Sequence, residues 1–598
     1  MQSSGLSHLS SRAAYLRAAS DLRDNPGQWD AYESAGHCVV LAGPGSGKTR
    51  TLTIKMARML AEDVPEPRGI ACITYNNECA RELEERLSAL GVEPNGRVFV
   101  GTVHSFSLTQ IILPYAKVAG MRLPDGFRVA TRAERADAMK AALAGYADPQ
   151  GWENRLSEYR RMHLDREGAA WRDTDADAAR LVEAFETQLR RRGLIDFDDM
   201  PLLAVRALRA HPWLQRALLA KYPVLVVDEY QDLGLALHQM VMGLCFSTGM
   251  RLFAVGDVDQ SIYGFTGARP DLLQKLSERA DVQTVSLRLN YRCGNRIVAA
   301  SRAALGQSRN YEAVKGAKQG AVFIHALGGR YEDQAAQFVA KLLPQALARN
   351  PGLGYGDVAV LYPFAWQGDS VANVATASDL PFVRTDSKAL YPRNSRLMQW
   401  LELCGQWCCG GWKTGSPRFS KVMGQGRRLF SEVLTSEPAL LDFHGKLIGC
   451  LWPRRDPGLK LHEWLNDLVE HLIEPLADEC VALHDELETL AAFMARVAPD
   501  GDRADMVLAS LAGDGSQLSR LTLSSLHSAK GREFGLVFIF GLDSRYFPHP
   551  KSNVSGVQES RRLFYVGFTR AKSEIHLVHT LNGASTFVDQ IRMHLAQA

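Results

Sequence analysis

A glycine-rich stretch near the N-terminus has residue types suited to binding the phosphates of a nucleoside triphosphate. Residues 42–50 read AGPGSGKTR. Glycines let backbone N–H groups turn toward phosphate oxygens, a lysine reaches the outer phosphates, and the next hydroxyl binds Mg²⁺. We therefore predict a phosphate-binding loop formed by Ala42, Gly43, Pro44, Gly45, Ser46, Gly47, Lys48 and Thr49.

The residues on either side of this loop predict the elements that position it. An apolar run over residues 38–42 predicts a strand, and the pattern after Thr49 predicts a helix whose dipole favours phosphate at its start. Ala42 stands where the usual pattern has glycine. A chance glycine turn is the alternative, and the flanking strand and helix make it the weaker one.

An acidic pair supplies the second half of a hydrolytic site. Residues 222–232 read YPVLVVDEYQD, in which four apolar residues predict a buried parallel strand. Ligands bind at the carboxyl ends of such strands. We expect Asp228 to hold Mg²⁺ together with Thr49, and Glu229 to position or deprotonate the attacking water. The sequence thus predicts hydrolysis of a nucleoside triphosphate.

Further polar motifs lie far along the chain. They read FAVGDVDQSIYGFTGARP (253–270), LRLNYRCGN (287–295), SSLHSAKGREFGLVFIFGL (524–542) and ESRRLFYVGFTRAK (559–572). Several arginines in them are too distant in sequence to belong to one nucleotide-binding domain. If these arginines act at the γ-phosphate, they must come from a second domain that closes over the nucleotide.

Taken in order, these motifs resemble those of the UvrD/Rep/PcrA group of superfamily 1 DNA helicases. The resemblance also includes ACITYNNECARELEER (71–86), GTVHSF (101–106) and IDFDDM (195–200), and it covers nearly all of the chain except about residues 385–515. It implies an α/β fold with two RecA-like P-loop motor domains, each interrupted by a mainly helical insertion domain.

The resemblance also implies roles for single residues around ATP. Gln28 should pair with the adenine edge, Tyr291 should stack on the base, and Arg50 should lie near the sugar or base. Arg292 and Arg570 resemble the two arginines that reach the γ-phosphate. Two further residues complete the set: Gln260, linking the γ-phosphate to the DNA track, and Glu533, binding the ribose hydroxyl.

A motor that moves on DNA without reading its sequence needs stacking platforms and backbone contacts. The stacking candidates are Tyr75, Tyr263 and Phe265, with packing in the core as the alternative for each. The polar candidates are Asn77, Thr102, His104 and His527.

Two positions depart from the pattern of this group on the DNA side. The motif that often reads WRGA is FTGA here, so Thr266 replaces an arginine, and Arg269 three residues later is no equivalent. Glu78 stands where a lysine is common, and a carboxylate repels phosphate. Weaker or differently routed coupling to DNA is therefore expected, with the ATPase centre intact.

The expected domain boundaries follow from where helical patterns interrupt the motifs. The first motor domain should use residues 1–107 and 187–275, and the second 276–384 and 516–598. Residues 108–186 and 385–515 should form the helical insertions, the latter with long helices over 459–498. The chain ends soon after the last motif, which argues against a fused nuclease domain.

Composition is ordinary for a globular protein, with 46% hydrophobic and 23% charged residues. Lys plus Arg is 69 against 66 for Asp plus Glu, so a nucleic-acid track must be a local patch. The ten cysteines show no regular spacing, and we find no targeting stretch and no apolar run of about 18 residues. A cytoplasmic protein that does not contact membranes is expected.

The insertion over residues 385–515 raises two further hypotheses. Cys404, Cys408, Cys409 and Cys450 could suggest zinc, but the usual second ligand pair is missing, and Cys404 and Cys408 share a helix face that suits core packing. A basic stretch of this insertion favours either a solvated surface or a nucleic-acid contact: Lys413, Arg418, Lys421, Arg427 and Arg428.

The leading interpretation is an ATP- and Mg²⁺-dependent helicase or translocase that moves 3′ to 5′ on single-stranded DNA and engages junctions with duplex. One alternative is a translocase that displaces proteins but unwinds little. Another is a nucleotide-switched DNA-sensing subunit of a larger assembly, for example one with a nuclease or repair factor as partner. Intact Lys48, Asp228, Glu229 and Arg570 weigh against a pure binder.

Overall fold

The chain folds into two compact units in a computed structural model. The structure describes residues 14–92, 97–144, 151–166, 168, 170–392, 395–477, 480, 483–512, 520–581 and 583–597. Unit 1 comprises Met1–Ser107, Ala204–Ser387 and Leu518–Ala598, and unit 2 comprises Leu108–Leu203 and Lys388–Gln517. Both parallel six-stranded sheets of the protein belong to unit 1.

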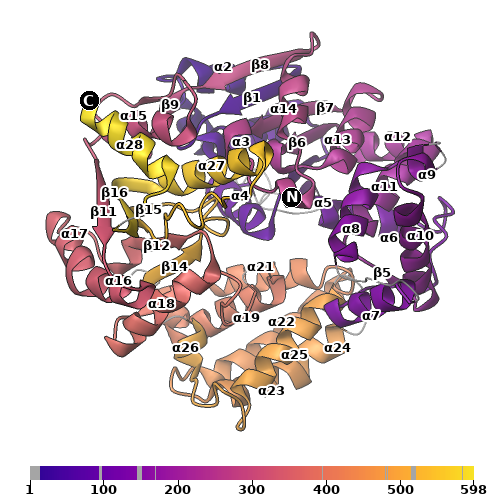
Figure 1. Cartoon of the computed structure of the whole chain (residues 1–598). Coiled ribbons are helices and arrows are strands. Elements are labelled where there is room, and N and C mark those ends of the chain that lie inside the picture. Colours follow the sequence, from indigo (N-terminus) through magenta and orange to yellow (C-terminus); the bar gives the residue numbers. More distant parts are fainter. Residues whose placement is uncertain are drawn as a thin grey trace. The chain divides into compact units, whose positions relative to one another are not determined.

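The first sheet has the strand order β3-β2-β6-β7-β1-β8, and every neighbouring pair is parallel. Its strands are β1 (His37–Ala42), β2 (Ile70–Thr74), β3 (Val98–Thr102), β6 (Val224–Val227), β7 (Arg251–Gly256) and β8 (Val282–Leu287). The apolar runs at 38–42 and 224–227 are strands, as the sequence predicts. Helices flank the sheet (Figure 1): α2 (Pro26–Glu33), α3 (Lys48–Arg58), α4 (Asn77–Ala89), α12 (Pro212–Lys221), α13 (Leu235–Val241) and α14 (Pro270–Ser277).

Strand β8 corrects the expected end of the first motor domain at residue 275. It pairs in parallel with β1, from His37 opposite Val282 to Ala42 opposite Leu287. It lies at the edge of the sheet, with Val285 and Leu287 buried and the intervening Ser286 exposed. The first sheet therefore continues to Leu287.

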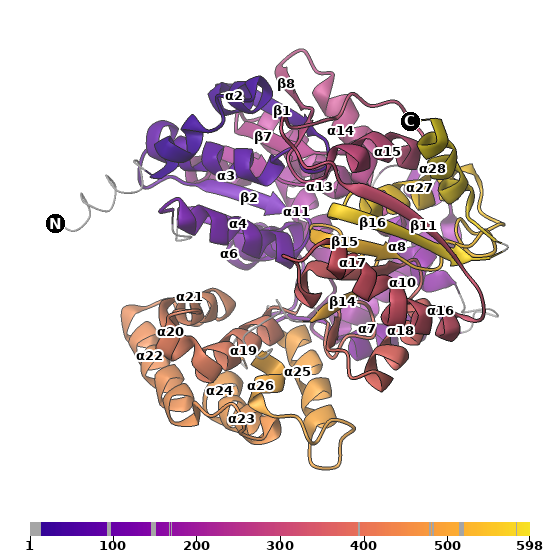
Figure 2. The same cartoon turned by 90° about the vertical axis from the view of Figure 1, so that its left-hand side faces the viewer.

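The second sheet has the order β11-β16-β15-β12-β14-β13, again with parallel neighbours. Figure 2 shows β11 and β16 side by side. The strands are β11 (Ala321–Leu327), β12 (Val358–Tyr362), β13 (Phe382–Arg384), β14 (Leu521–Ser525), β15 (Phe534–Ile539) and β16 (Ala571–Thr580). Its helices are α15 (Asn295–Leu305), α16 (Tyr331–Gln337), α17 (Leu343–Arg349), α18 (Ala365–Ala377), α27 (Val554–Phe568) and α28 (Thr586–Gln597).

Unit 2 is mainly helical. Its first segment contains β4 (Arg128–Val129), α7 (Arg132–Ala142), α8 (Trp152–Met162), α9 (Ala170–Asp173), α10 (Ala176–Arg191) and β5 (Leu194–Ile195). Its second segment contains α19 (Arg396–Gln406), α21 (Phe419–Leu429), α22 (Glu437–Leu451), α23 (Leu461–Leu468), α24 (Glu474–Ala477), α25 (His484–Val497) and α26 (Leu508–Ala512). Cys404 and Cys408 are buried in the apolar core of this second segment, which confirms the packing interpretation.

Unit 2 extends to Leu203, whereas the sequence places the end of the first insertion at residue 186. A buried ion-pair network explains the difference. Arg160 on α8, 1% exposed, donates to Asp196 Oδ2 at 2.8 Å and to Asp199 Oδ1 at 2.8 Å. A buried guanidinium requires such partners, so the segment after α10 stays with unit 2.

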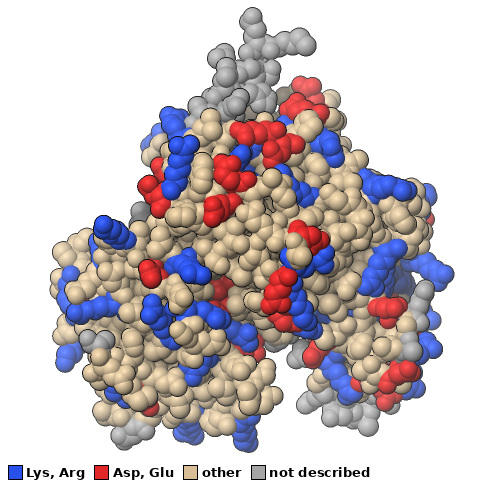
Figure 3. All heavy atoms as spheres, turned by 90° about the horizontal axis from the view of Figure 1, so that it is seen from above, with Lys and Arg blue, Asp and Glu red and all other residues tan. Residues whose placement is uncertain are grey.

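Acidic and basic side chains are interspersed over the face drawn in Figure 3, in keeping with a formal charge of +3. Within the part of the chain that the structure describes, no helix is both long and apolar enough to cross a membrane.

Candidate nucleotide site and nucleic-acid surface

The glycine-rich loop lies between β1 and α3, as the sequence predicts. Ser46 Oγ donates to the carbonyl oxygen of Gly43 at 2.7 Å, and Thr51 N–H donates to that of Gly47 at 2.9 Å. Gly47 precedes the helix with a φ of +81°, a conformation that favours glycine. The loop thus delivers Lys48 and Thr49 at the N-terminus of α3, where the helix dipole favours an anion.

The acidic pair follows β6, two strands away from β1 in the sheet. Lys48 Nζ lies 3.2 Å from Glu229 Oε1. Asp228 is 3% exposed, and its Oδ1 has no hydrogen-bond partner among the residues that the structure describes. Buried carboxylate oxygens are normally satisfied, so an unpartnered one beside a phosphate-binding loop fits a metal ligand.

The charges of this group are strongly coupled. Burial raises the pKa of Asp228, and the neighbouring Glu229 raises it further. Burial also acts to raise the pKa of Glu229, but Lys48 and Lys530 outweigh it, so that the pKa is lowered. The pKa of Lys48 is raised, because Glu229 and Asp257 outweigh the effect of its burial. Lys48 is therefore cationic and Glu229 anionic at neutral pH.

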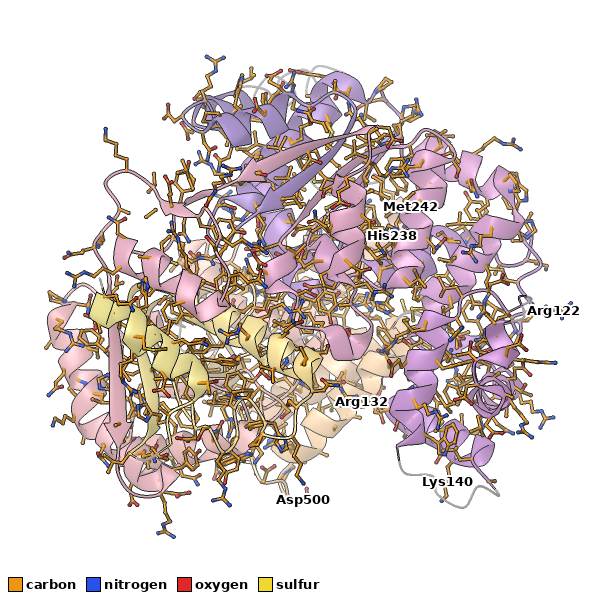
Figure 4. All side chains as sticks on the ribbon, turned by 45° about the horizontal axis from the view of Figure 1, so that its top comes forward. Arg122, Arg132, Lys140, His238, Met242 and Asp500 are labelled. Atoms are coloured by element: carbon orange, nitrogen blue, oxygen red, sulfur yellow. The ribbon has the colours of Figure 1, made fainter. Side chains whose placement is uncertain are left out.

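Hydrogen bonds of the two residues after Glu229 hold its turn in place. Glu229 has a φ of +51°, which is uncommon for a residue with a side chain. Gln231 Nε2 donates to its Oε2. The buried Tyr230 hydroxyl lies 2.8 Å from Nδ1 of His238, which sits on α13 next to Met242 (Figure 4). The surrounding contacts thus fix a carboxylate in a strained backbone position.

The segment after β7 connects this centre to the second sheet. Asp257 N–H donates to Gln231 Oε1 at 2.9 Å, and Gln260 Nε2 donates to Asp257 Oδ2 at 2.5 Å. From the loop after β14, Lys530 Nζ donates to the carbonyl oxygen of Gln260 at 2.6 Å and forms an ion pair with Asp232.

Two predicted arginines approach the same place from the second sheet. Arg570, 2% exposed, donates from Nη2 to Gln260 Oε1 at 3.0 Å and from Nε to the carbonyl oxygen of Val566 at 2.9 Å. Arg292 Nε lies 2.8 Å from Glu533 Oε2, so two residues predicted for different parts of ATP pair with each other. The site is therefore built from both sheets.

The residues predicted for the adenine lie together at the other end of the loop. Gln28 Nε2 donates to the carbonyl oxygen of Ser46 at 2.9 Å. Asn25 caps the helix of Gln28 and donates to the Tyr291 hydroxyl at 3.1 Å, and Tyr291 N–H donates to the Gly45 carbonyl oxygen at 2.8 Å. Arg50 points elsewhere: it is exposed and pairs with Asp21 at 2.6 Å.

The predicted DNA residues follow the carboxyl ends of several strands. The rings of Tyr75 and Tyr263 stack on each other with centroids 4.4 Å apart, so each covers one face of the other. Tyr263 Oη donates to the carbonyl oxygen of His527 at 3.5 Å. The remaining positions are Asn77 at the start of α4, Thr102 as the N-cap of α5 (Val103–Phe106), His104 within α5, and Phe265, whose side chain lies outside the described part.

Two of the residues at or near the positions that depart from the helicase motifs, Thr266 and Arg269, contact residues close to them in the sequence. Thr266 Oγ1 donates to the carbonyl oxygen of Tyr263 at 2.8 Å, and Arg269 pairs with Asp271 at 2.8 Å. Arg269 is thus engaged elsewhere and does not replace the missing arginine. Glu78 is exposed in the first turn of α4.

Sequence reasoning missed several residues of this centre. Asp257 and Lys530 belong to motifs given above. Their spacing in the sequence does not show that Asp257 contacts Gln260 or that Lys530 pairs with Asp232. Tyr311 carries no motif signal, yet a Cβ added at Gly43 would lie 2.5 Å from its ring.

Comparison with known proteins agrees with this geometry. The model of the UvrD/REP helicase N-terminal domain matches residues 24–281, and that of the UvrD-like helicase C-terminal domain matches residues 463–582. The chain belongs to the UvrD-like helicase family. Its two parallel sheets are thus RecA-like motor domains, and it is an ATP-hydrolysing DNA helicase by family.

Curated relatives cover most of this UvrD-like chain. The ATP-dependent DNA helicase PcrA of Staphylococcus aureus (strain Mu50) is 25% identical over 91% of this chain and 81% of its own length. The ATP-dependent DNA helicase Rep of Escherichia coli (strain K12) is 26% identical over 93% of this chain and 90% of its own length. Rep of Salmonella typhimurium is 25% identical with the same coverage.

Proposed function

We propose that this helicase couples ATP hydrolysis to 3′ to 5′ movement along single-stranded DNA and to strand separation. The observation that carries the proposal is the hydrogen bond from Arg570, next to the second sheet, to Gln260, next to the first. A buried arginine linked to a glutamine at a nucleotide site can respond to the γ-phosphate and transmit that response to the DNA side.

The residues around the loop have distinct tasks in this proposal. Lys48 neutralises the outer phosphates, and Glu229, held anionic beside it, orients the attacking water and accepts its proton. Arg570 and Arg292 stabilise the charge that develops on the γ-phosphate. Gln28 and Tyr291 bind the adenine, and Glu533 binds the ribose.

The donor set fits Mg²⁺. Asp228, with its unpartnered buried Oδ1, and the Thr49 hydroxyl would hold the ion. When bound, it would neutralise phosphate charge and orient the phosphates for displacement.

Single-stranded DNA would cross the carboxyl edges of both sheets at Tyr75, Tyr263 and His527. Unwinding assays on duplexes with a 3′ or a 5′ single-stranded tail test the polarity. We expect ATP-dependent unwinding of the 3′-tailed duplex alone, abolished by Glu229→Gln. Preferential unwinding of the 5′-tailed duplex contradicts the proposal.

The threonine at position 266 favours a second candidate, a translocase that displaces bound proteins and unwinds little. It removes one cationic contact from the expected DNA surface. Displacement of streptavidin from biotinylated single strands, without unwinding of the tailed duplexes, would support this candidate. Nucleotide-dependent DNA binding without hydrolysis would instead support a sensor subunit acting with a protein partner.

A further inference from the structure

Large exposed aromatic side chains gather at one edge of the second sheet. Trp366 is 42% exposed and Phe364 is 37% exposed. Both come directly after β12, which ends at Tyr362, so they lie at its carboxyl end. Contiguous exposed apolar surface marks binding sites, whereas isolated exposed rings do not.

These rings are braced although they are exposed. Trp366 forms T-shaped contacts with Tyr331, at a centroid distance of 5.0 Å and an interplanar angle of 84°, and with Tyr546, at 5.4 Å and 70°. Phe364 is nearly parallel to Trp366, at 6.4 Å and 11°. We call Tyr331, Phe364, Trp366 and Tyr546 the aromatic platform. These three ring contacts hold the indole in place before any ligand arrives.

The aromatic platform continues the edge on which the predicted DNA residues lie. Strand β14 lies beside β12 (Figure 1), with Ser525 opposite Tyr362, and Leu526 N–H donates to the Tyr362 carbonyl oxygen at 2.9 Å. His527 follows directly and contacts Tyr263. The segment that carries Phe364 and Trp366 thus begins beside the segment that carries His527.

Cationic and acidic groups both lie near the aromatic platform. The guanidinium of Arg545 lies 5.5 Å from the Tyr546 ring. The nearby Asp543 carboxylate accepts from the Tyr331 hydroxyl at 2.5 Å and from Thr580 N–H at 2.6 Å, and Asp369 pairs with Arg384 at 2.6 Å. These two carboxylates are thus hydrogen-bonded or ion-paired, and Trp366 and Phe364 keep 42% and 37% of their surface exposed.

We propose that the aromatic platform stacks a base of the single-stranded DNA on the second motor domain. The inference rests on the proposed function. Stacking on Trp366 is independent of base identity, because every base offers a π-face, and it compensates for the arginine absent at position 266. The ligand class is an unpaired nucleotide segment, and the contact is to a base and not to phosphate.

Fluorescence anisotropy with a labelled deoxythymidine oligonucleotide tests the proposal in the full-length protein. Trp366→Ala should raise Kd roughly 5- to 150-fold, the range for loss of one stacked base. The salt dependence of binding should be unchanged, since no phosphate contact is lost. Trp366→Phe should recover most of the affinity, and Trp366→Leu, which keeps apolar bulk without a ring, should not.

A matched control is Tyr355→Ala. Tyr355 is also an aromatic residue 37% exposed, but it precedes β12 and so lies at the opposite edge of the sheet. This variant should bind as the unaltered protein does. An oligonucleotide with abasic sites should bind the unaltered protein more weakly than the intact oligonucleotide does. With the abasic oligonucleotide, the unaltered protein and Trp366→Ala should have the same affinity.

The outcomes separate this inference from the proposed function. Unchanged DNA affinity in Trp366→Ala, with weakened binding in Tyr263→Ala, would overturn the aromatic platform and leave the helicase proposal standing. Equal losses in the phenylalanine and leucine variants would also overturn stacking. Failure of the unaltered protein to bind single-stranded DNA would overturn both.

Discussion

Replacing Arg570 by alanine removes the guanidinium that joins the two motor domains at Gln260. The side chain is 2% exposed and has acceptors in Gln260 and in the carbonyl oxygens of Val566 and Arg532. A fixed, buried cation costs no reorganisation when charge develops on a phosphate, so its loss should act on the transition state.

The expected magnitude follows from this arrangement. Arginines at a transferred phosphoryl group contribute about 10³ to 10⁵ in kcat. Arg292 remains in the variant, so we expect the lower end, about 10³-fold or roughly 4 kcal/mol. Steady-state ATP hydrolysis with saturating single-stranded DNA measures it, and the KM for ATP should change much less than kcat.

Two further variants guard the interpretation. Arg570→Lys keeps a charge but not the planar fork that reaches Gln260 and Val566. Its kcat should therefore exceed that of Arg570→Ala by less than about tenfold. Arg592→Ala removes a half-exposed arginine that pairs with Asp589 on α28, and it should hydrolyse ATP normally. If Arg570→Ala retains kcat within about threefold, the role assigned to this arginine is wrong.

Three other perturbations have defined outcomes. Lys530→Met leaves the Asp232 carboxylate buried alone and should cost about 3–5 kcal/mol of stability in denaturant melts at neutral pH. Burial raises the pKa of Asp232 to about 6 although Lys530 lowers it, so the pKa should be higher still in the variant. The loss of stability should shrink as the pH falls and this carboxyl is protonated, and Asp232→Asn should relieve it. Arg160→Met should destabilise unit 2 by less, because Arg135 still lies 3.5 Å from Asp196 and Arg190 still lies 2.9 Å from Asp199. An unchanged denaturant melt would exclude a structural role for Arg160. Thr266→Arg should tighten single-stranded DNA binding at low salt and steepen the log–log salt slope by about 0.7, and an unaltered slope would mean that the new arginine meets no phosphate.

The sequence predicts the local parts of the ATP site well. A strand, a glycine loop and a helix, or an apolar strand that ends in Asp228 and Glu229, are specified by residues close together in the chain. The hydrophobic periodicity and the turn residues that specify these elements lie within a few residues of each other, so the elements can be predicted without knowledge of the tertiary structure.

Contacts between distant segments could not be predicted in the same way. The pairing of β8 with β1 moves the end of the first sheet to Leu287, although the sequence places the domain boundary at residue 275. The stacking of Tyr75 on Tyr263 and the ion pair of Lys530 with Asp232 depend on how loops after separate strands meet. Spacing in the sequence carries no information on such neighbours.

Steady-state ATP hydrolysis without polymer, with single-stranded DNA and with single-stranded RNA of equal length tests the central claim most directly. A large stimulation by DNA that Glu229→Gln abolishes is the result that a two-domain ATP motor with Glu229 as its water-positioning carboxylate predicts. A rate that is low and indifferent to DNA, with purified and folded protein, would contradict it.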